Sequence, residues 1–187
     1  AILVSSCADE NLKNISTDEA YQKYGHLVSN KLFFAFPEER EKPVKWFDSI
    51  PEVKLKKIVR PGNYVLDARP GEIFICQAGI WALNSDVSDI QIEFSDFIGR
   101  RGRVINYSRA TCYNLGGTDF RGNIFKKQVN IPKGRVQAFW IAIDLDSIPS
   151  GNYKGSISIM AGGESQIIPL LIKVSGDPIS NHGYNEG

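Results

Sequence analysis

Apolar and polar residues alternate with a period of two along most of the chain from residue 53 onward. Such alternation places successive side chains on opposite faces of a β-strand. Turn-forming residues, mainly glycine, proline, asparagine and aspartate, separate most of the alternating runs. The pattern therefore predicts strands over 53–59, 63–68, 71–83, 89–97, 103–113, 124–131, 135–145, 153–160 and 165–174.

Two of these runs predict which face belongs to the core. The run 71–83 has one face made only of small and apolar residues, namely Phe74, Cys76, Ala78, Ile80 and Ala82. In the run 135–145 the more apolar face is the one opposite Trp140, so Trp140 is expected to face outward or toward a partner. The last three runs, over 134–175, are joined by turns that include 149–155, and they predict a β-meander.

The order of the elements predicts an all-β fold. No long helix separates consecutive strands, which excludes parallel β-α-β units and favours an antiparallel two-sheet β-sandwich, immunoglobulin-like or jelly-roll-like. Ahead of it, Ser16 and Glu19 have the spacing of a capping box and predict a short helix over 17–24. Residues 31–36 predict a first strand, followed by a charged loop over 37–43.

We divide the chain into three parts on this basis. Residues 1–30 form a signal remnant and a polar tail, 31–176 form the β-sandwich domain, and 177–187 form a linker.

The first seven residues, Ala-Ile-Leu-Val-Ser-Ser-Cys, resemble the end of a bacterial lipoprotein signal. Cys7 is then the lipidation site, which predicts an exported protein of the outer membrane or cell surface. No run approaches the roughly 18 to 20 apolar residues that span a bilayer, so attachment is expected through the lipid alone. The alternative for this segment is a buried strand end with a free thiol.

Cys76 and Cys112 lie within strand-like runs. They form either a disulfide or a pair of buried reduced thiols, and the reduced state is favoured.

The charge balance excludes several classes of partner. Lysine and arginine number 22 against 21 acidic residues, a net charge of +1, which gives no long-range field for nucleic acid or anionic membranes. Local basic clusters are expected to be solvated loops or strand edges. These clusters are Lys54, Lys56, Lys57 and Arg60; Arg100, Arg101 and Arg103; and Arg121, Lys126 and Lys127.

No catalytic motif is present. The chain has no nucleophile elbow, no phosphate-binding glycine loop and no paired-cysteine or paired-histidine metal motif, so no cofactor and no metal are expected. Carboxylates that could in principle act as a glycosidase pair are Asp96, Asp119, Asp144 and Asp146. We expect Asp144 and Asp146 to serve turn geometry. Asp119, in a glycine-rich loop, is expected to lie on a contact surface.

Aromatic residues offer a second kind of site, because Trp and Tyr rings stack on sugars. The available rings are those of Trp81, Trp140, Tyr107 and Tyr113. The candidate residues for a domain interface or for sugar contact are Asn114, Gly116, Gly117, Asp119, Trp140 and Trp81.

Four segments, in this order and spacing, resemble the amino-terminal β-sandwich of glycoside hydrolase family 123 and related bacterial proteins. They are 69–82 (RPGEIFICQAGIWA), 111–120 (TCYNLGGTDF), 132–140 (PKGRVQAFW) and the turn 149–155 (PSGNYKG). The resemblance covers residues 55–187.

The resemblance implies a (β/α)₈ barrel after the sandwich, which removes N-acetylgalactosamine with an adjacent Asp-Glu pair. In this chain such pairs occur only at Asp9-Glu10 and Asp18-Glu19, ahead of the sandwich, so no catalytic residue is carried over. We therefore expect a non-catalytic module of a surface-lipoprotein glycoside hydrolase, whose partner is the catalytic barrel of the same polypeptide. The alternatives are an autonomous carbohydrate-binding module and a structural or adhesive surface lipoprotein.

Overall fold

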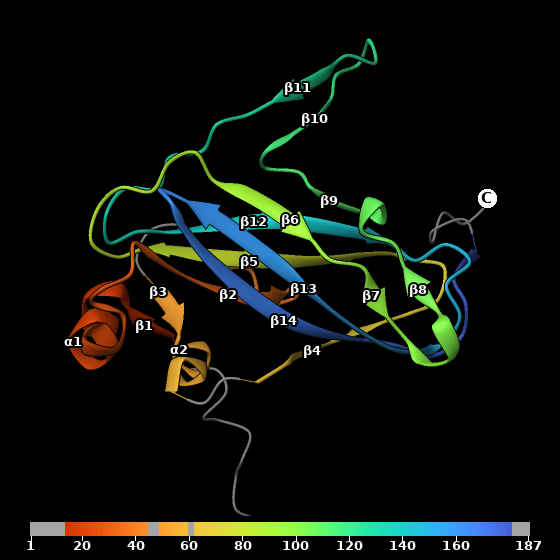
Figure 1. Cartoon of the computed structure of the whole chain (residues 1–187), viewed down its shortest axis with the longest axis horizontal. Coiled ribbons are helices and arrows are strands. Elements are labelled where there is room, and N and C mark those ends of the chain that lie inside the picture. Colours follow the sequence, from red (N-terminus) through yellow and green to blue (C-terminus); the bar gives the residue numbers. More distant parts are fainter. Residues whose placement is uncertain (1–13, 45–48, 60–61, 181–187) are drawn as a thin grey trace, which may run out of the picture.

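Two β-sheets pack face to face, and two helices cover the outer face of one of them (Figure 1). The computed structural model describes residues 14–44, 49–59 and 62–180 of the 187-residue chain. The predicted two-sheet β-sandwich is confirmed in these residues.

The first sheet has four strands, and every neighbouring pair in it is antiparallel. In spatial order they are β2 (Phe33–Glu39), β5 (Ile73–Ala82), β12 (Val136–Asp144) and β9 (Ala110–Cys112). The long strand β5 is central and pairs with β2 along one edge and with β12 along the other.

The second sheet has six strands. They are β4 (Tyr64–Ala68), β14 (Glu164–Val174), β13 (Gly151–Ala161), β7 (Phe97–Ile98) and β8 (Val104–Ile105), in this spatial order, and β6 (Gln91–Phe94), which also pairs with β13. All the pairs are antiparallel except β4 with β14, which is parallel.

Smaller elements surround the sandwich. They are β1 (Asn14–Ser16) paired with β3 (Ser49–Pro51), the hairpin of β10 (Gly116–Thr118) and β11 (Ile124–Lys126), the helices α1 (Thr17–Val28) and α2 (Glu52–Val59), and two single 3₁₀ turns (Arg100–Gly102 and Tyr107–Arg109). The Tyr107–Arg109 turn interrupts the strand predicted over 103–113, and the irregular residues 95–96 divide the strand predicted over 89–97. The Arg100–Gly102 turn lies between these two predicted strands.

The predicted β-meander over 134–175 is wrong. Strand β12 belongs to the first sheet and β13 to the second, so the connection over 145–150 crosses from one sheet to the other. Both strands have an apolar face, and each faces the same core from opposite sides. Of the three strands predicted for the meander, β13 and β14 form a hairpin, through Gly162 and Gly163, which both have positive φ.

The strand predicted over 53–59 is also wrong, because these residues form α2. A short run that mixes apolar residues and lysines does not distinguish a helix from a strand. The helix buries Leu55, and Lys54 reaches the buried carboxylate of Glu38 on β2 at 3.3 Å. At the helix start, Glu52 accepts hydrogen bonds from Lys23 and Tyr24 of α1.

The beginning of the chain follows its prediction with two changes of extent. Ser16 caps α1 by accepting a hydrogen bond from the Glu19 amide at 3.1 Å, and the helix continues to Val28 instead of ending at 24. Strand β2 continues through Pro37 to Glu39, residues predicted to form a loop. Proline is tolerated there because β2 is an edge strand.

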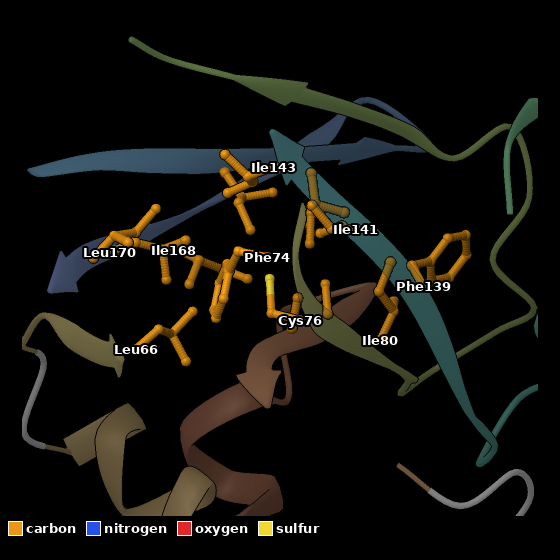
Figure 2. Packing of buried hydrophobic residues seen from close by; sticks show 14 of the residues in the cluster. Leu66, Phe74, Cys76, Ile80, Phe139, Ile141, Ile143, Ile168 and Leu170 are labelled. Atoms are coloured by element: carbon orange, nitrogen blue, oxygen red, sulfur yellow. The ribbon is translucent and has the colours of Figure 1, made fainter. Parts of the chain in front are cut away.

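The main core lies between the two sheets (Figure 2). The core faces predicted for β5 and β12 are confirmed. Their side chains meet those of the second sheet and are labelled in Figure 2 as Phe74, Cys76, Ile80, Phe139, Ile141 and Ile143 on one side, and Leu66, Ile168 and Leu170 on the other.

A second buried cluster lies beneath α1 and α2, on the other face of the first sheet. Trp81 is its largest side chain, with 1% of its surface exposed, and Tyr21 of α1 packs edge-on against it. Gln77 is fully buried nearby; its Oε1 accepts from the Val44 amide and its Nε2 donates to the Glu39 carbonyl, both at 2.9 Å. Strand β5 is therefore covered on both faces.

Cys76 and Cys112 are free thiols, as favoured from the sequence. Cys76 on β5 and Cys112 on β9 both lie opposite Ile141 of the intervening strand β12. Two strand spacings, about 9–10 Å, separate their backbones, which exceeds the reach of a disulfide. Burial raises the pKa of Cys76 to about 12.

This pKa predicts a loss of stability in alkali. The thiol of Cys76 ionises near pH 9 in the unfolded chain but near 12 when folded, so its contribution is complete below pH 9 and is lost as the pH rises toward 12. At pH 10.5 the loss is about 2 kcal/mol. The variant Cys76→Ala is less stable at pH 8 through lost packing, but its unfolding free energy should fall by about 2 kcal/mol less between pH 8 and pH 10.5. Urea titrations at both pH values measure this difference, and an equal fall in the two proteins would contradict it.

Candidate functional site

The hairpin of β10 and β11 projects away from both sheets (Figure 1). The chain leaves the first sheet after Cys112, runs out along β10 and returns along β11. Gly116 needs to be glycine, because a Cβ there would lie 2.5 Å from the carbonyl oxygen of Phe125. The close approach of two backbones thus fixes the base of the hairpin.

Asn114 fixes the point where the chain leaves the sheet. Its Oδ1 accepts from the amide of Trp140 at 2.7 Å, and its Nδ2 donates to the carbonyl of Ala138 at 3.2 Å. One amide side chain thus pairs with the backbone of β12 as a strand residue would. The neighbouring Tyr113 amide also donates to the Trp140 carbonyl.

Asp119 holds the tip of the hairpin. Its Oδ1 accepts from the amides of Arg121 and Asn123, both at 2.8 Å, and its Oδ2 accepts from the side-chain amide of Asn123 at 3.1 Å. The hydrogen bonds from the backbone and side chain of Asn123 lower the pKa of Asp119. Gly122, with φ of +83°, completes the turn.

Large apolar side chains are exposed on this hairpin. Phe120 is 91% exposed and Ile124 is 86% exposed, and Phe125 is also exposed. The guanidinium of Arg121 lies 5.1 Å from the centre of the Phe120 ring. Sequence reasoning did not single out these three apolar residues. The signal that could have found them is that they flank a glycine-containing turn where polar residues are the norm.

A groove of about 660 Å³ lies between the hairpin and the body of the sandwich. One wall comes from β6, the floor from 107–112 and the other wall from the hairpin. Its described lining is mostly apolar and consists of Ile92, Glu93, Phe94, Tyr107, Ser108, Ala110, Thr111, Cys112, Leu115, Gly116, Gly117, Ile124, Phe125 and Lys126.

The groove has little capacity for acid–base chemistry. Of its described lining residues, Glu93 is the one carboxylate, whereas glycoside hydrolysis usually needs two. Burial raises the pKa of the Cys112 thiol, which keeps it protonated and a poor nucleophile at neutral pH. The groove is therefore suited to contact with a partner that presents apolar groups.

Three of the four candidate carboxylates, including Asp119 described above, accept hydrogen bonds from backbone amides. Asp96 accepts from the Tyr107 amide and Asp144 accepts from the Asp146 amide, both at 2.8 Å. A smaller cavity of about 250 Å³ contains Glu39 and Glu41, which are paired with Lys42 and with Arg40.

Four of the six contact candidates lie together at the hairpin, and the two tryptophans lie elsewhere. Gly116 and Gly117 line the groove, and Asn114 and Asp119 support the hairpin that forms one wall of it. Trp140 is half-buried on the face of β12 away from the main core, and Trp81 is buried beneath α1. Cys7 lies outside the described residues.

Within the described ranges, no cluster of three or more His, Cys, Asp or Glu residues could hold a metal ion. No described helix is long and apolar enough to cross a bilayer.

Comparison with known proteins gives a similarity of fold. No protein family and no curated protein matches the sequence. The chain is similar to part of a family 123 glycoside hydrolase from Clostridium perfringens, which hydrolyses glycolipid glycans, with a TM-score of 0.55 and 18% identity. The aligned region covers 80% of this chain and 28% of that enzyme, so the chain resembles one domain of a longer hydrolase.

Two fimbrial proteins are more distantly similar. The major subunit of Myf fimbriae from Yersinia enterocolitica has a TM-score of 0.39 and 11% identity, over 62% of this chain and 94% of that one. The CooA pilin subunit from enterotoxigenic Escherichia coli has a TM-score of 0.33 and 11% identity, over 76% of this chain and 99% of that one.

The role of Asn114 predicts the effect of its removal. Asn114→Ala leaves the Trp140 amide without its partner and should lower the free energy of unfolding by about 1–2 kcal/mol. Hydrogen exchange at the Trp140 amide should accelerate more than at amides of β5. The matched control is Asn130→Ala, since Asn130 is exposed and has no side-chain hydrogen bond among the described residues. Similar exchange rates in the two variants would contradict the anchoring role.

Proposed function

We propose that this chain is a non-catalytic β-sandwich module of a glycoside hydrolase that acts on N-acetylgalactosamine-containing glycans, and that it packs on the catalytic barrel of the same polypeptide. The similarity of fold to 28% of a family 123 enzyme supports this context. Three of the four candidate carboxylates accept hydrogen bonds from backbone amides, which supports a non-catalytic role.

The observation that carries the proposal is the apolar hairpin. Phe120 and Ile124 extend almost fully exposed from a rigidly capped turn, beside an apolar groove. Exposed apolar groups that are clustered in this way typically become buried against a partner. A neighbouring domain of a longer hydrolase is the partner that is most consistent with the similarity of fold.

The hairpin defines a test in the full-length protein. A protease site placed after residue 180 allows the module and the remainder to be separated by cleavage and their association to be measured by size-exclusion chromatography. Phe120→Ser with Ile124→Ser should weaken this association at least about tenfold, because two central apolar anchors are lost. Their exposure means that the module itself should keep its unfolding temperature. The control is Ile167→Ser with Val65→Ser, which changes exposed apolar residues of the second sheet.

Two results would overturn the proposal. A barrel that is soluble and fully active without the module would remove the packing role. Saturable binding of N-acetylgalactosamine oligosaccharides to the isolated module, measured by calorimetry, would instead support an autonomous carbohydrate-binding module. In that case Tyr107 and Phe125 of the groove would be the first residues to replace.

The proposal includes a lipid anchor on Cys7, which rests on the sequence alone. In a bacterial host that processes lipoproteins, the full-length precursor should incorporate labelled fatty acid and fractionate with membranes. Cys7→Ala should abolish both, because only the cysteine thiol accepts the diacylglycerol. Cys112→Ala is the control for labelling of other thiols. Labelling that persists in Cys7→Ala would contradict the anchor.

A further inference from the structure

Four basic residues gather at one end of the sandwich. Arg100, Arg101 and Arg103 come from the turn between β7 and β8, and Lys173 comes from the end of β14. They line a cavity of about 540 Å³. The rest of its described lining is Ser150, Gly151, Asn152, Val174 and Ser175. The sequence predicted the arginines as a solvated loop or strand edge, and they do lie in a turn. The fold places Lys173 and the 150–152 loop beside them.

The arginine turn has an unusual backbone. Its ends are joined by hydrogen bonds from the Arg103 amide to the Arg100 carbonyl at 3.3 Å and from the Gly99 amide to the Arg103 carbonyl at 2.8 Å. Arg101 and Gly102 both have positive φ, of 58° and 72°, as in a type I′ turn. Asparagine or glycine is preferred at the first of these positions, and an arginine there is strained. A binding role for the guanidinium of Arg101 would explain why an arginine occupies this strained position.

The opposite wall is fixed by two hydrogen bonds. The Tyr153 hydroxyl donates to the Pro149 carbonyl at 2.7 Å and holds the loop that precedes β13. Arg103 Nη1 donates to the Ser150 carbonyl at 3.0 Å and ties this loop to the arginine turn. The cavity is therefore built from two connected walls.

The charges in this cavity are unbalanced. None of its described lining residues is acidic, and Arg100, Arg101, Arg103 and Lys173 form no ion pair with the described residues. Elsewhere in the described part, basic side chains do pair with acids, as Lys42 does with Glu39. Like charges brought together at this density repel each other, and a bound anion relieves the repulsion.

We infer that this cavity is an oxyanion-binding site for a sulfate or phosphate group, carried as an ester on a sugar. Arginine guanidinium groups bind such oxygens in a bidentate manner, and a lysine adds a point charge. The hydroxyls of Ser150 and Ser175 and the amide of Asn152 supply hydrogen bonds to the sugar. Nucleic acid is disfavoured, because no aromatic ring lines the described cavity to stack on a base. The oxyanion site follows from the basic residues of the cavity, whereas the choice of a sugar as the carrier rests on the proposed function.

Isothermal titration of the protein in low-salt buffer tests the site. The probes are inorganic sulfate, inorganic phosphate, N-acetylgalactosamine 4-sulfate, unsulfated N-acetylgalactosamine and a short DNA duplex. The informative variant is Arg100→Gln with Arg101→Asn, because asparagine suits the left-handed position and should preserve the turn. The control is Lys127→Gln with Lys133→Gln, which removes the same net charge from exposed positions elsewhere.

We expect saturable binding of the sulfated sugar that the arginine variant weakens at least about tenfold and the control leaves unchanged. Equal affinity for the inorganic ions would support the site and identify the free ion as its ligand. Three results would overturn the inference: no saturable binding of any oxyanion, equal weakening in both variants, or tightest binding of the DNA duplex. Unchanged unfolding temperatures confirm that both variants are folded.

Discussion

The burial of strand β5 on both faces is the constraint on which the arrangement of the other elements depends. Its Cys76 face requires a second sheet, and its Trp81 face requires α1 and α2. A half-exposed sheet of the usual sandwich type would have left Trp81 at the surface. Because both faces of β5 are covered, the first sheet is left with its edges, the projecting hairpin and the ends of its strands for contacts with other molecules.

Amide side chains satisfy the backbone where the sheets end. Gln166 of β14 accepts from the amide and donates to the carbonyl of Ala35, at 2.8 and 2.6 Å, and so joins the two sheets at the outer edge of β2. Gln77 likewise accepts from the Val44 amide and donates to the Glu39 carbonyl. Asn114 pairs in the same way with the backbone of β12. Buried or edge backbone groups left unpaired would be costly, so these three residues determine where each edge can stop. Asn114 lies where the chain leaves the first sheet and continues into the hairpin.

The sequence predicted the fold class and the faces of β5 and β12, because a period of two depends only on local geometry. It did not predict that 145–150 crosses between sheets, since the same alternation suits either sheet. Helix α2 was missed because Leu55 and its lysine neighbours fit both periods. The two candidate sites are assembled from distant segments: Tyr107 meets Phe125 in the groove, and Arg101 meets Lys173 in the basic cavity. A local sequence pattern does not show which distant residues the fold brings into one site.

The parallel pairing of β4 with β14 has a consequence for the synthesis of the protein. Tyr64 is matched to Leu170, and almost the whole sandwich lies between them in the chain. At translation rates of about 5 to 20 residues per second, β4 waits several seconds for its only partner strand. During that time the apolar side chains of Leu66 and Ala68 have no sheet to enter. The second sheet therefore cannot be completed along its β4 edge until β14 has left the ribosome.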